Sequence, residues 1–243
     1  MKAIILASGV GRRLLPLTRD KPKCLVKINN QTILGRLLKQ ITDFKINAVI
    51  ITTGAFEDKV KEFVNNNFPN LNVYYVRNPK FDKTNYIYSL WLAKEFIDDD
   101  ILLIHGDIVV DHTLIKRLIE SEYRTCVLVS SKSKRNVIKK DFKCKIEGGS
   151  IKKIGIDISE SNIFHLMPVY KISREDFTKW LAEIEKFIIS GKLNFYIEDA
   201  FNNISNKINL KPIYYKDELC MEIDDIIDLA IVRGELSKTN FGE

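Results

Sequence analysis

Short continuous apolar segments alternate, through the first half of the chain, with segments whose apolar positions recur every three or four residues. Continuous apolar runs predict buried strands, and the three-to-four spacing predicts amphipathic helices. The strands are expected at residues 3–7, 48–53, 72–77, 101–105 and 125–130, and the helices at 33–41, 57–64, 85–97 and 112–121. Alternating strands and helices predict a parallel sheet covered by helices on both faces.

The pattern changes after residue 135. Residues 142–156 predict a hairpin that turns at Gly148 and Gly149. Further strands are expected at 162–170, 208–215 and 219–223, and helices at 173–189, at 196–204 and from Asp224 onwards. Internal repeats, low-complexity tracts and flexible linkers are all missing from the sequence, so we expect one domain over residues 1–236, with halves 1–135 and 136–236 and a polar tail at 237–243.

Glycines and cationic residues follow the first predicted strand directly. Gly9 and Gly11 precede Arg12 and Arg13, and Lys23 comes shortly after. Glycine lets backbone N–H groups approach phosphate oxygens closely, and Arg and Lys neutralise their charge. The segment therefore predicts a polyphosphate-binding loop. It is not a P-loop, because no Gly-Lys-Ser/Thr follows, and it is not G-x-G-x-x-G, because position 14 is Leu.

The longer string around this loop carries a family resemblance. It reads Leu6-Ala7-x-Gly9-x-Gly11-x-Arg13-Leu14-x-Pro16-Leu17-Thr18, followed by Pro22-Lys23-x-Leu25. This string resembles the signature of the nucleotidyltransferases that join a nucleoside triphosphate to a small phosphorylated substrate. Ser8 and Cys24 are small departures from it. The resemblance implies an α/β fold of the Rossmann-like, GT-A-like type: a mixed, mostly parallel sheet with helices on both faces, whose first half binds nucleotide and whose second half binds the acceptor.

Asp107 directly follows the fourth predicted strand and Gly106. Ligands bind beyond the carboxyl ends of strands in open parallel sheets, where the glycine loop, Gly54 and Asn78 are also expected. A carboxylate there is well placed to hold Mg²⁺ over phosphates. The alternative is a turn or helix-capping aspartate.

A second acidic site lies at Glu222-Ile223-Asp224. The family uses a late acidic residue as its other Mg²⁺ ligand, and the resemblance assigns that role to Asp224. Asp225 and Glu222 are rivals, and capping of the C-terminal helix stays open for Asp224 and Asp225.

The resemblance also implies roles for the loop. Lys23 would stabilise the transition state of attack on the α-phosphorus, and Arg13 would hold the leaving phosphates. With Asp107 they form the expected catalytic set, with CTP as co-substrate and Mg²⁺ as cofactor. The expected nucleotide-binding residues are Leu6, Ala7, Ser8, Gly9, Gly11, Arg12, Gly54, Thr84 and Asn85.

Two further segments resemble cytidylyltransferases that act on phosphocholine or 2-aminoethylphosphonate: residues 84–93 and 190–199. The resemblance places Asp199 beside the ammonium of the substrate, with Tyr196 close by; a solvated helix acid is the alternative. Asp141 is a further acceptor-binding candidate, or an ordinary surface acid. A primary ammonium needs carboxylate acceptors, whereas a quaternary one needs an aromatic cage, so we expect 2-aminoethylphosphonate rather than phosphocholine.

Composition limits the remaining classes. The net charge is +6, but lysines and acids are interleaved, so nucleic-acid binding is not expected. The four cysteines are far apart and predict reduced thiols. No apolar run is long enough for a membrane span and no signal-peptide core is visible, so we expect a cytoplasmic protein. A homodimer, a fusion to a partner enzyme, a sugar-1-phosphate nucleotidyltransferase and a non-catalytic nucleotide-binding module stay open.

Overall fold

A computed structural model describes residues 1–131, 141–158 and 163–239. Its helices are α1 (Ile33–Asp43), α2 (Glu57–Asn67), α3 (Tyr86–Leu92), α4 (His112–Glu120), α5 (Arg174–Ile189), α6 (Ile197–Ile204) and α7 (Ile226–Thr239). Short 3-10 helices span Arg12–Leu14, Lys23–Leu25 and Lys94–Phe96. The strands are β1 (Lys2–Leu6), β2 (Lys27–Ile28), β3 (Gln31–Thr32), β4 (Ala48–Thr53), β5 (Asn72–Arg77), β6 (Ile101–His105), β7 (Ile108–Val110), β8 (Cys126–Ser130), β9 (Lys143–Glu147), β10 (Ser150–Gly155), β11 (Ile163–Ile172), β12 (Lys211–Tyr215) and β13 (Cys220–Glu222).

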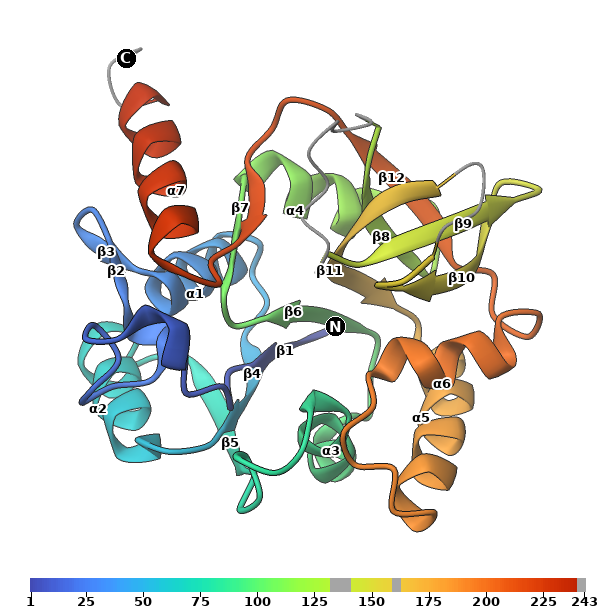
Figure 1. Cartoon of the computed structure of the whole chain (residues 1–243), viewed down its shortest axis with the longest axis horizontal. Helices are drawn as coiled ribbons and strands as arrows, with labels where there is room; N and C mark the ends of the chain where they lie inside the picture. Colours follow the sequence, from blue (N-terminus) through green and yellow to red (C-terminus); the bar gives the residue numbers. More distant parts are fainter. Residues whose placement is uncertain (132–140, 159–162, 240–243) are drawn as a thin grey trace.

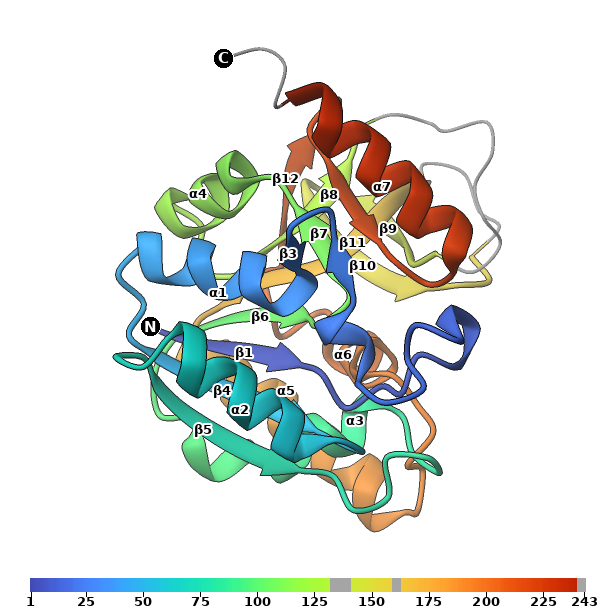
Figure 2. The ribbon, with the colours of Figure 1, turned by 90° about the vertical axis from the view of Figure 1, so that its left-hand side faces the viewer.

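The central sheet is mixed. Strands β6, β1, β4 and β5 are parallel and adjacent in that order, as Figure 2 shows. The long strand β11 then runs antiparallel to β6 and also pairs with β8 and β9, and β12 lies parallel to β8. The expected sheet with helices on both faces is confirmed. Its antiparallel part begins where the regular alternation of strands and helices in the sequence stops.

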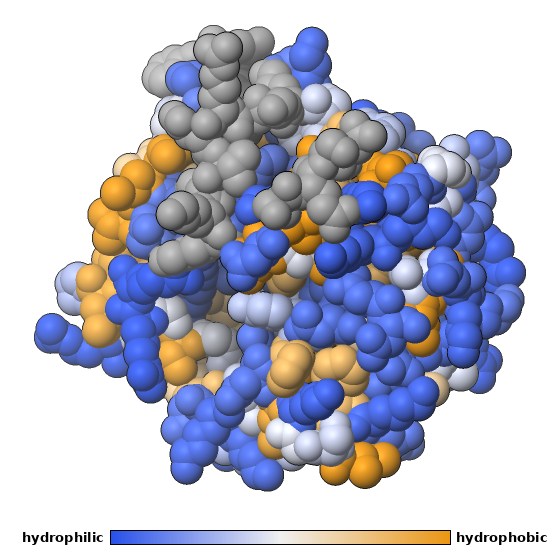
Figure 3. Space-filling model, turned by 45° about the vertical axis from the view of Figure 1, so that its right-hand side comes forward, coloured by the Kyte–Doolittle hydropathy of each residue, from blue (hydrophilic) through white to orange (hydrophobic). Residues whose placement is uncertain are grey.

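Helices cover both faces of this sheet with separate apolar cores. Side chains of α1, α2, α4 and α7 share one core, which includes Leu34, Val60 and Leu114. Side chains of α3, α5 and α6 share the other, which includes Leu90, Trp180 and Phe201. Figure 1 shows α5 and α6 together, on the opposite side of the sheet from α1 and α2. The side of the molecular surface that Figure 3 shows is mostly hydrophilic, with apolar residues in scattered groups.

Most predicted elements are found within a few residues of their expected bounds. The helix expected at 85–97 is shorter, because α3 ends at Leu92 and Ala93 leads into a 3-10 helix. The C-terminal helix begins at Ile226 instead of Asp224. Strand β7 and the β2–β3 hairpin were not predicted. These strands are too short for a clear alternating pattern.

The remaining bulk expectations concern cysteines and membranes. The four cysteines all lie in the described part of the chain, are buried and form no disulfide. Among the described residues, no helix combines the length and the apolar character that crossing a membrane requires.

Candidate active site

The glycine loop after β1 is shaped by close contacts that only glycine allows. Gly11 has φ of +73°, and a Cβ there would lie 2.9 Å from Cβ of Lys23. The hydroxyl of Thr18 donates to the carbonyl oxygen of Gly11 at 2.8 Å. Gly54, after β4, packs against the loop, since a Cβ would lie 2.4 Å from the carbonyl oxygen of Ser8. These contacts fix the loop against the carboxyl edge of the parallel strands.

Lys23 connects the two predicted metal ligands. Its Nζ lies 2.7 Å from Oδ2 of Asp107 and 3.0 Å from Oδ1 of Asp224. The Arg13 guanidinium contacts the same Asp224 oxygen at 2.9 Å. The catalytic and metal-binding residues expected from the sequence therefore lie together in one cluster. Arg12 and Arg13 are both exposed on the 3-10 helix Arg12–Leu14.

The pairing of two short strands brings Asp107 and Asp224 together. Asp107 lies in the turn between β6 and β7, and β7 pairs antiparallel with β13, which ends just before Asp224. The N–H of Ile223 donates to the carbonyl oxygen of Asp107 at 2.9 Å. Asp107 is thus held in a strand-to-strand turn and caps no helix.

Asp225 takes the capping role at α7. Its Oδ1 accepts from the N–H groups of Ile227 at 2.8 Å and Asp228 at 3.1 Å. Oδ2 of Asp228 in turn accepts from the N–H of Asp224 at 2.9 Å. The Asp224 carboxylate is therefore directed to Lys23 and Arg13, which favours Asp224 over Asp225 as the site residue.

The opposite charges in this cluster shift the pKa values of Lys23 and Asp107. Burial lowers the pKa of Lys23, but the carboxylates of Asp107 and Asp224 more than offset this, so the pKa is raised above its ordinary value. Burial raises the pKa of Asp107, and the nearby charges of Lys23 and His105 outweigh it, so that pKa is lowered. The lysine is therefore cationic and the aspartate anionic at neutral pH.

The donor set fits a divalent cation. Oδ1 of Asp107 is buried and, within the described part of the chain, has no hydrogen-bond partner. Two carboxylates that face one ammonium also suit Mg²⁺, which takes one or two protein carboxylates together with phosphate oxygens.

A first cavity, of about 170 Å³, opens beside this cluster on the nucleotide side. Five of the expected nucleotide-binding residues line it: Leu6, Ser8, Gly9, Thr84 and Asn85. Ala7 is buried next to it and donates its N–H to the carbonyl oxygen of Thr52. Asn85 caps α3, because its Oδ1 accepts from the N–H of Tyr86 at 2.8 Å. Asn78 and Ser89 also line the cavity. Asn78 was expected at this edge of the sheet, but neither residue was named as nucleotide-binding. The signal for Asn78 was its place after a strand, at the carboxyl edge.

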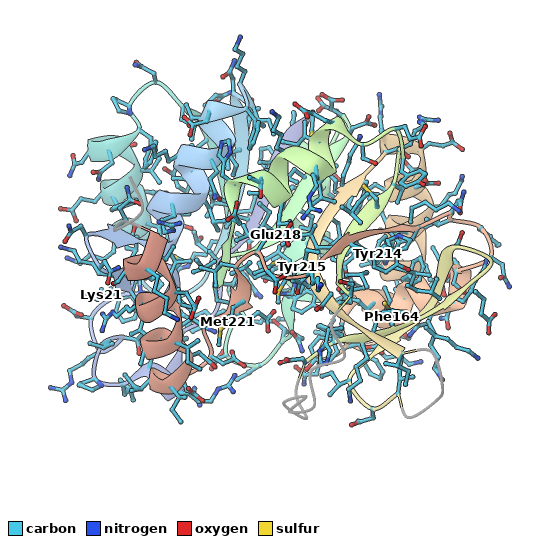
Figure 4. All side chains as sticks on the ribbon, turned by 90° about the horizontal axis from the view of Figure 1, so that it is seen from above. Lys21, Phe164, Tyr214, Tyr215, Glu218 and Met221 are labelled. Carbon is cyan, nitrogen blue, oxygen red and sulfur yellow. The ribbon has the colours of Figure 1, made fainter. Side chains whose placement is uncertain are left out.

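A second cavity, of about 300 Å³, is lined by Asp224. Arg13 and Asp141 line it, together with Met167, Tyr215 and Met221. Figure 4 shows Tyr215 and Met221 on the α7 side of Tyr214 and Phe164. This cavity joins the acceptor candidate Asp141 to the catalytic cluster.

Asp199 and Tyr196 lie apart from both cavities, at the start of α6. Oδ2 of Asp199 accepts from the N–H of Tyr196 at 2.8 Å, as a helix-capping acid does. The Tyr196 ring packs against Tyr86 and Phe142, with centroids at 5.5 and 5.1 Å. Their expected contact with the acceptor stays a prediction.

The sequence reasoning missed the neighbour Glu198. This carboxylate is 1% exposed and accepts from the hydroxyls of Tyr170, at 2.6 Å, and Tyr86. The Tyr86 ring contacts the His105 ring edge-on at 4.4 Å, and Nδ1 of His105 lies 3.6 Å from Oε1 of Glu222. His105 is buried next to the cluster. No motif or residue spacing in the sequence predicts that Glu198, Tyr86 and His105 lie close together.

Comparison with known proteins agrees with this geometry. The profile described as nucleotidyl transferase matches residues 2–147. CTP:phosphoglutamine cytidylyltransferase of Campylobacter jejuni is 26% identical over an alignment 255 residues long, which covers 95% of this chain and 98% of that protein. CMP-5'-(3-aminopropyl)phosphonate synthase of Streptomyces rubellomurinus is 29% identical over 130 residues, covering 54% of this chain and 21% of that protein.

Two solved structures share the fold. The inositol-1-phosphate CTP transferase of T. maritima superposes with a TM-score of 0.81 at 23% identity, covering 99% of this chain and 96% of that one. CTP:phosphocholine cytidylyltransferase of Streptococcus pneumoniae gives 0.76 at 21% identity, covering 97% and 98%. The expectation of an enzyme of this class is confirmed, and cytidylyltransferases that use CTP are among the relatives. With its glycine loop, its lysine and its paired aspartates, the chain belongs to the nucleotidyl transferase family.

Proposed function

We propose that the chain is an Mg²⁺-dependent cytidylyltransferase. It transfers CMP from CTP to a small phosphonate or phosphate that carries an amine, 2-aminoethylphosphonate or phosphocholine, and releases pyrophosphate. The observation that carries this proposal is the ammonium of Lys23, held between Asp107 and Asp224 at the edge of the nucleotide cavity.

The reaction that this cluster supports is an in-line displacement. An oxygen of the acceptor phosphonate or phosphate attacks the α-phosphorus of CTP, and the bond from the α-phosphorus to the bridging oxygen breaks, so pyrophosphate leaves with the electron pair. Little covalent chemistry is required of the protein, because positioning and charge stabilisation dominate such transfers. Lys23 stabilises the charge that develops on the α-phosphoryl oxygens, and Arg13 holds the leaving phosphates.

Asp107 and Asp224 are the residues that would hold Mg²⁺. When bound, the ion neutralises the phosphate oxygens and so supplies electrostatic stabilisation to the transfer. Between them, the two carboxylates orient Lys23 and Arg13 toward the same point.

The charge of the acceptor cavity supports an amine-bearing substrate. In its described lining, carboxylates belong to Asp141, Glu222, Asp224, Asp225 and Asp228, whereas Arg13 is the single arginine or lysine. Asp225 and Asp228 are engaged at the start of α7, and Asp224 faces Lys23. Asp141 and Glu222 line the same cavity, with Oδ2 of Asp141 at 3.9 Å from Nδ1 of His165 and Oε1 of Glu222 at 3.6 Å from Nδ1 of His105. Their carboxylates are the candidate acceptors for a substrate ammonium.

The aromatic side chains and carboxylates of the same lining support a choice between the two substrate head groups. Two phenyl or phenol rings belong to the described lining, Phe142 and Tyr215, and two rings do not enclose a quaternary ammonium. A primary ammonium, with three N–H donors, matches the carboxylates better. We therefore favour 2-aminoethylphosphonate over phosphocholine. The names of the two relatives, which mention phosphoglutamine and an aminopropylphosphonate, also describe small nitrogen-bearing phosphorus compounds.

Pyrophosphate release tests the proposal. The enzyme is incubated with Mg²⁺ and CTP plus either 2-aminoethylphosphonate or phosphocholine, and a third reaction contains UTP and glucose 1-phosphate. We expect release with CTP and an amine-bearing acceptor, faster with 2-aminoethylphosphonate. Release only in the sugar reaction would overturn the acceptor assignment, and CTP binding without any release would support the non-catalytic alternative.

Asp141→Asn, with the exposed Asp157→Asn as matched control, tests the ammonium contact. Loss of the carboxylate should raise KM for the amine acceptor and leave KM for CTP unchanged, whereas the control should change neither. Equal KM values for the acceptor in both variants would remove Asp141 from the acceptor site.

A further inference from the structure

Buried polar groups at the floor of the nucleotide cavity form one connected hydrogen-bond network. Its centre is Asn78, which is 1% exposed and lies directly after β5. Its amide nitrogen donates to the hydroxyl of Thr84 at 2.9 Å and to that of Ser89 at 3.0 Å. The side chains of all three residues line the cavity.

The orientation of the Asn78 amide is fixed by its other contact. The N–H of Lys80 donates to Oδ1 of Asn78 at 2.8 Å. Because a backbone N–H only donates, Oδ1 is the acceptor, and the opposite atom is the NH₂ group. Both protons of that group are used by Thr84 and Ser89, so each of these hydroxyls receives a hydrogen bond from Asn78.

The hydroxyl protons of Thr84 and Ser89 are used inside the protein as well. Thr84 donates to the carbonyl oxygen of Lys80 at 2.9 Å, and a carbonyl only accepts. Ser89 donates to the hydroxyl of Ser8 at 3.1 Å, and Ser8 donates onward to Thr52 at 3.1 Å. One chain of donors therefore runs from Asn78 through Ser89 and Ser8 to Thr52.

A hydroxyl has one proton and two lone pairs. Thr84 and Ser89 have each given their proton to a protein acceptor and have each filled one lone pair with an Asn78 proton. What they still offer to a ligand is a lone pair. The cavity therefore presents acceptors, not donors, at these two positions.

We propose that this network selects the nucleotide base, and that Asn78 is the positioning residue that sets the selection. Cytosine carries an exocyclic amine, which donates, where uracil carries a carbonyl, which accepts. Acceptor oxygens at these two positions stabilise the amine of cytosine. The carbonyl oxygen of uracil would instead face lone pairs that carry the same negative partial charge. This inference rests on the proposed function, because it concerns the same nucleotide site, and it explains the use of CTP rather than UTP.

Equilibrium binding without acceptor substrate tests the proposal directly. Dissociation constants are measured in Mg²⁺ for CTP, for UTP and for the triphosphate of the pyrimidin-2-one riboside, which lacks the exocyclic amine. The wild-type protein should bind CTP about tenfold tighter than the amine-free analogue, the factor that one hydrogen bond to a ligand typically contributes. UTP should bind at least as weakly as the analogue, because its carbonyl meets unpaired acceptors.

The variants separate selection from general damage. In Thr84→Val and Ser89→Ala together, the preference for CTP over the analogue should fall to near unity, because the affinity for CTP falls more than the affinity for the analogue. In Asn78→Ala the hydroxyls of Thr84 and Ser89 lose the donor that orients them, so their lone pairs are no longer held toward the base and the ratio of CTP to UTP affinity should fall at least about fivefold. Thr178→Val is the matched control. Its hydroxyl also donates to a carbonyl four residues earlier, at 2.8 Å on α5, so it should leave all three constants unchanged.

Each outcome decides one question. Equal wild-type affinity for CTP and the amine-free analogue would overturn the inference and leave nucleotidyl transfer standing. An equal loss for all three nucleotides in the variants would overturn it too, because it would show a structural role. Failure of the wild-type protein to bind any triphosphate would overturn the proposed function itself. If Asn78→Ala does not fold, Thr84→Val alone still tests the acceptor role, because its hydroxyl lies at a partly exposed position.

Discussion

Nζ of Lys23 lies 2.7 Å from Oδ2 of Asp107, although 84 residues separate them in the sequence. The lysine follows the glycine loop and the aspartate follows β6, so the contact forms where two neighbouring parallel strands end. Asp224 contacts the same nitrogen from the distant C-terminal segment. The contact joins the lysine that we propose acts on the phosphates to carboxylates suited to a metal ion.

Lys23→Met should reduce kcat about 100-fold or more, the range seen when one preorganised donor to a transition-state charge is removed. The methylene chain is kept, so packing changes little. Pyrophosphate release at saturating CTP measures the effect. Lys21→Met, an equally long lysine two residues earlier, serves as the control. A kcat within threefold of wild type would assign Lys23 a structural role only.

Asp224→Asn should weaken Mn²⁺ binding in the presence of CTP at least about tenfold, since even residues that only orient metal ligands affect affinity by that much. Titration followed by electron paramagnetic resonance measures free Mn²⁺. Asp225→Asn is the matched neighbour: asparagine retains the oxygen that accepts from Ile227 and Asp228, so metal affinity should not change. The reverse ranking of the two variants would assign the metal to Asp225.

Gly11→Ala should cost about 1–2 kcal/mol of folding free energy, because an L-residue is strained at this positive φ. The added Cβ also meets Lys23 at 2.9 Å, so activity should fall beyond what the lost stability explains. Gly191→Ala provides the comparison, since Gly191 has φ of +74° and no heavy atom within 4 Å of a built Cβ. Gly11→Ala should lose at least as much stability as Gly191→Ala, measured by urea unfolding, because it adds the contact with Lys23 to the same backbone strain. If both also lose similar activity, the contact with Lys23 is irrelevant.

Glu198→Gln should remove a pH dependence of stability. Burial raises the pKa of Glu198 above the unfolded value of about 4.3. Between those two values the native state binds more protons than the unfolded state, so the free energy of unfolding falls as the pH rises through this window. The variant lacks that fall and should therefore lose stability relative to wild type at low pH and gain it toward neutrality. Urea unfolding at a series of pH values from 4 to 8 measures the difference.

Glu183→Gln gives a control of opposite sign. A hydrogen bond from Lys186 lowers the pKa of Glu183, so its contribution is present above the unfolded pKa and is lost as the pH falls. Parallel stability curves for wild type and Glu198→Gln would show that the raised pKa of Glu198 does not contribute.

The local part of the site was predictable from the sequence. The glycine loop, Lys23 and Asp107 each follow a strand that a continuous apolar run predicts, and parallel strands end at one edge. The expected nucleotide-binding residues include Leu6, Ser8 and Thr84, and all three line the first cavity; their role in binding stays a prediction. The sequence also made Asp141 a candidate in the acceptor-binding half of the chain, and Asp141 lines the second cavity.

Contacts between distant segments were not predictable in the same way. The resemblance favoured Asp224 over Asp225, although the residue types alone do not separate two adjacent aspartates before a helix; the capping bonds of Asp225 support that choice. In the sequence, Asp199 was the candidate site residue and Glu198 only preceded it. In the structure, Glu198 is the buried carboxylate and Asp199 caps the helix. A one-residue difference on a helix turns a side chain by about 100°, and periodicity does not say which side is buried deeper.

The sequence by itself determined the strands, most helices, the sheet edge and the phosphate loop, because these depend on local apolar periodicity and on glycine. The tertiary structure decided the rest: the antiparallel turn of the sheet at β11, the β7–β13 pairing that joins Asp107 to Asp224, and the direction of the hydrogen bonds around Asn78. Those features depend on which distant groups satisfy one another's hydrogen bonds and charges once the chain is folded, and no local pattern records that choice.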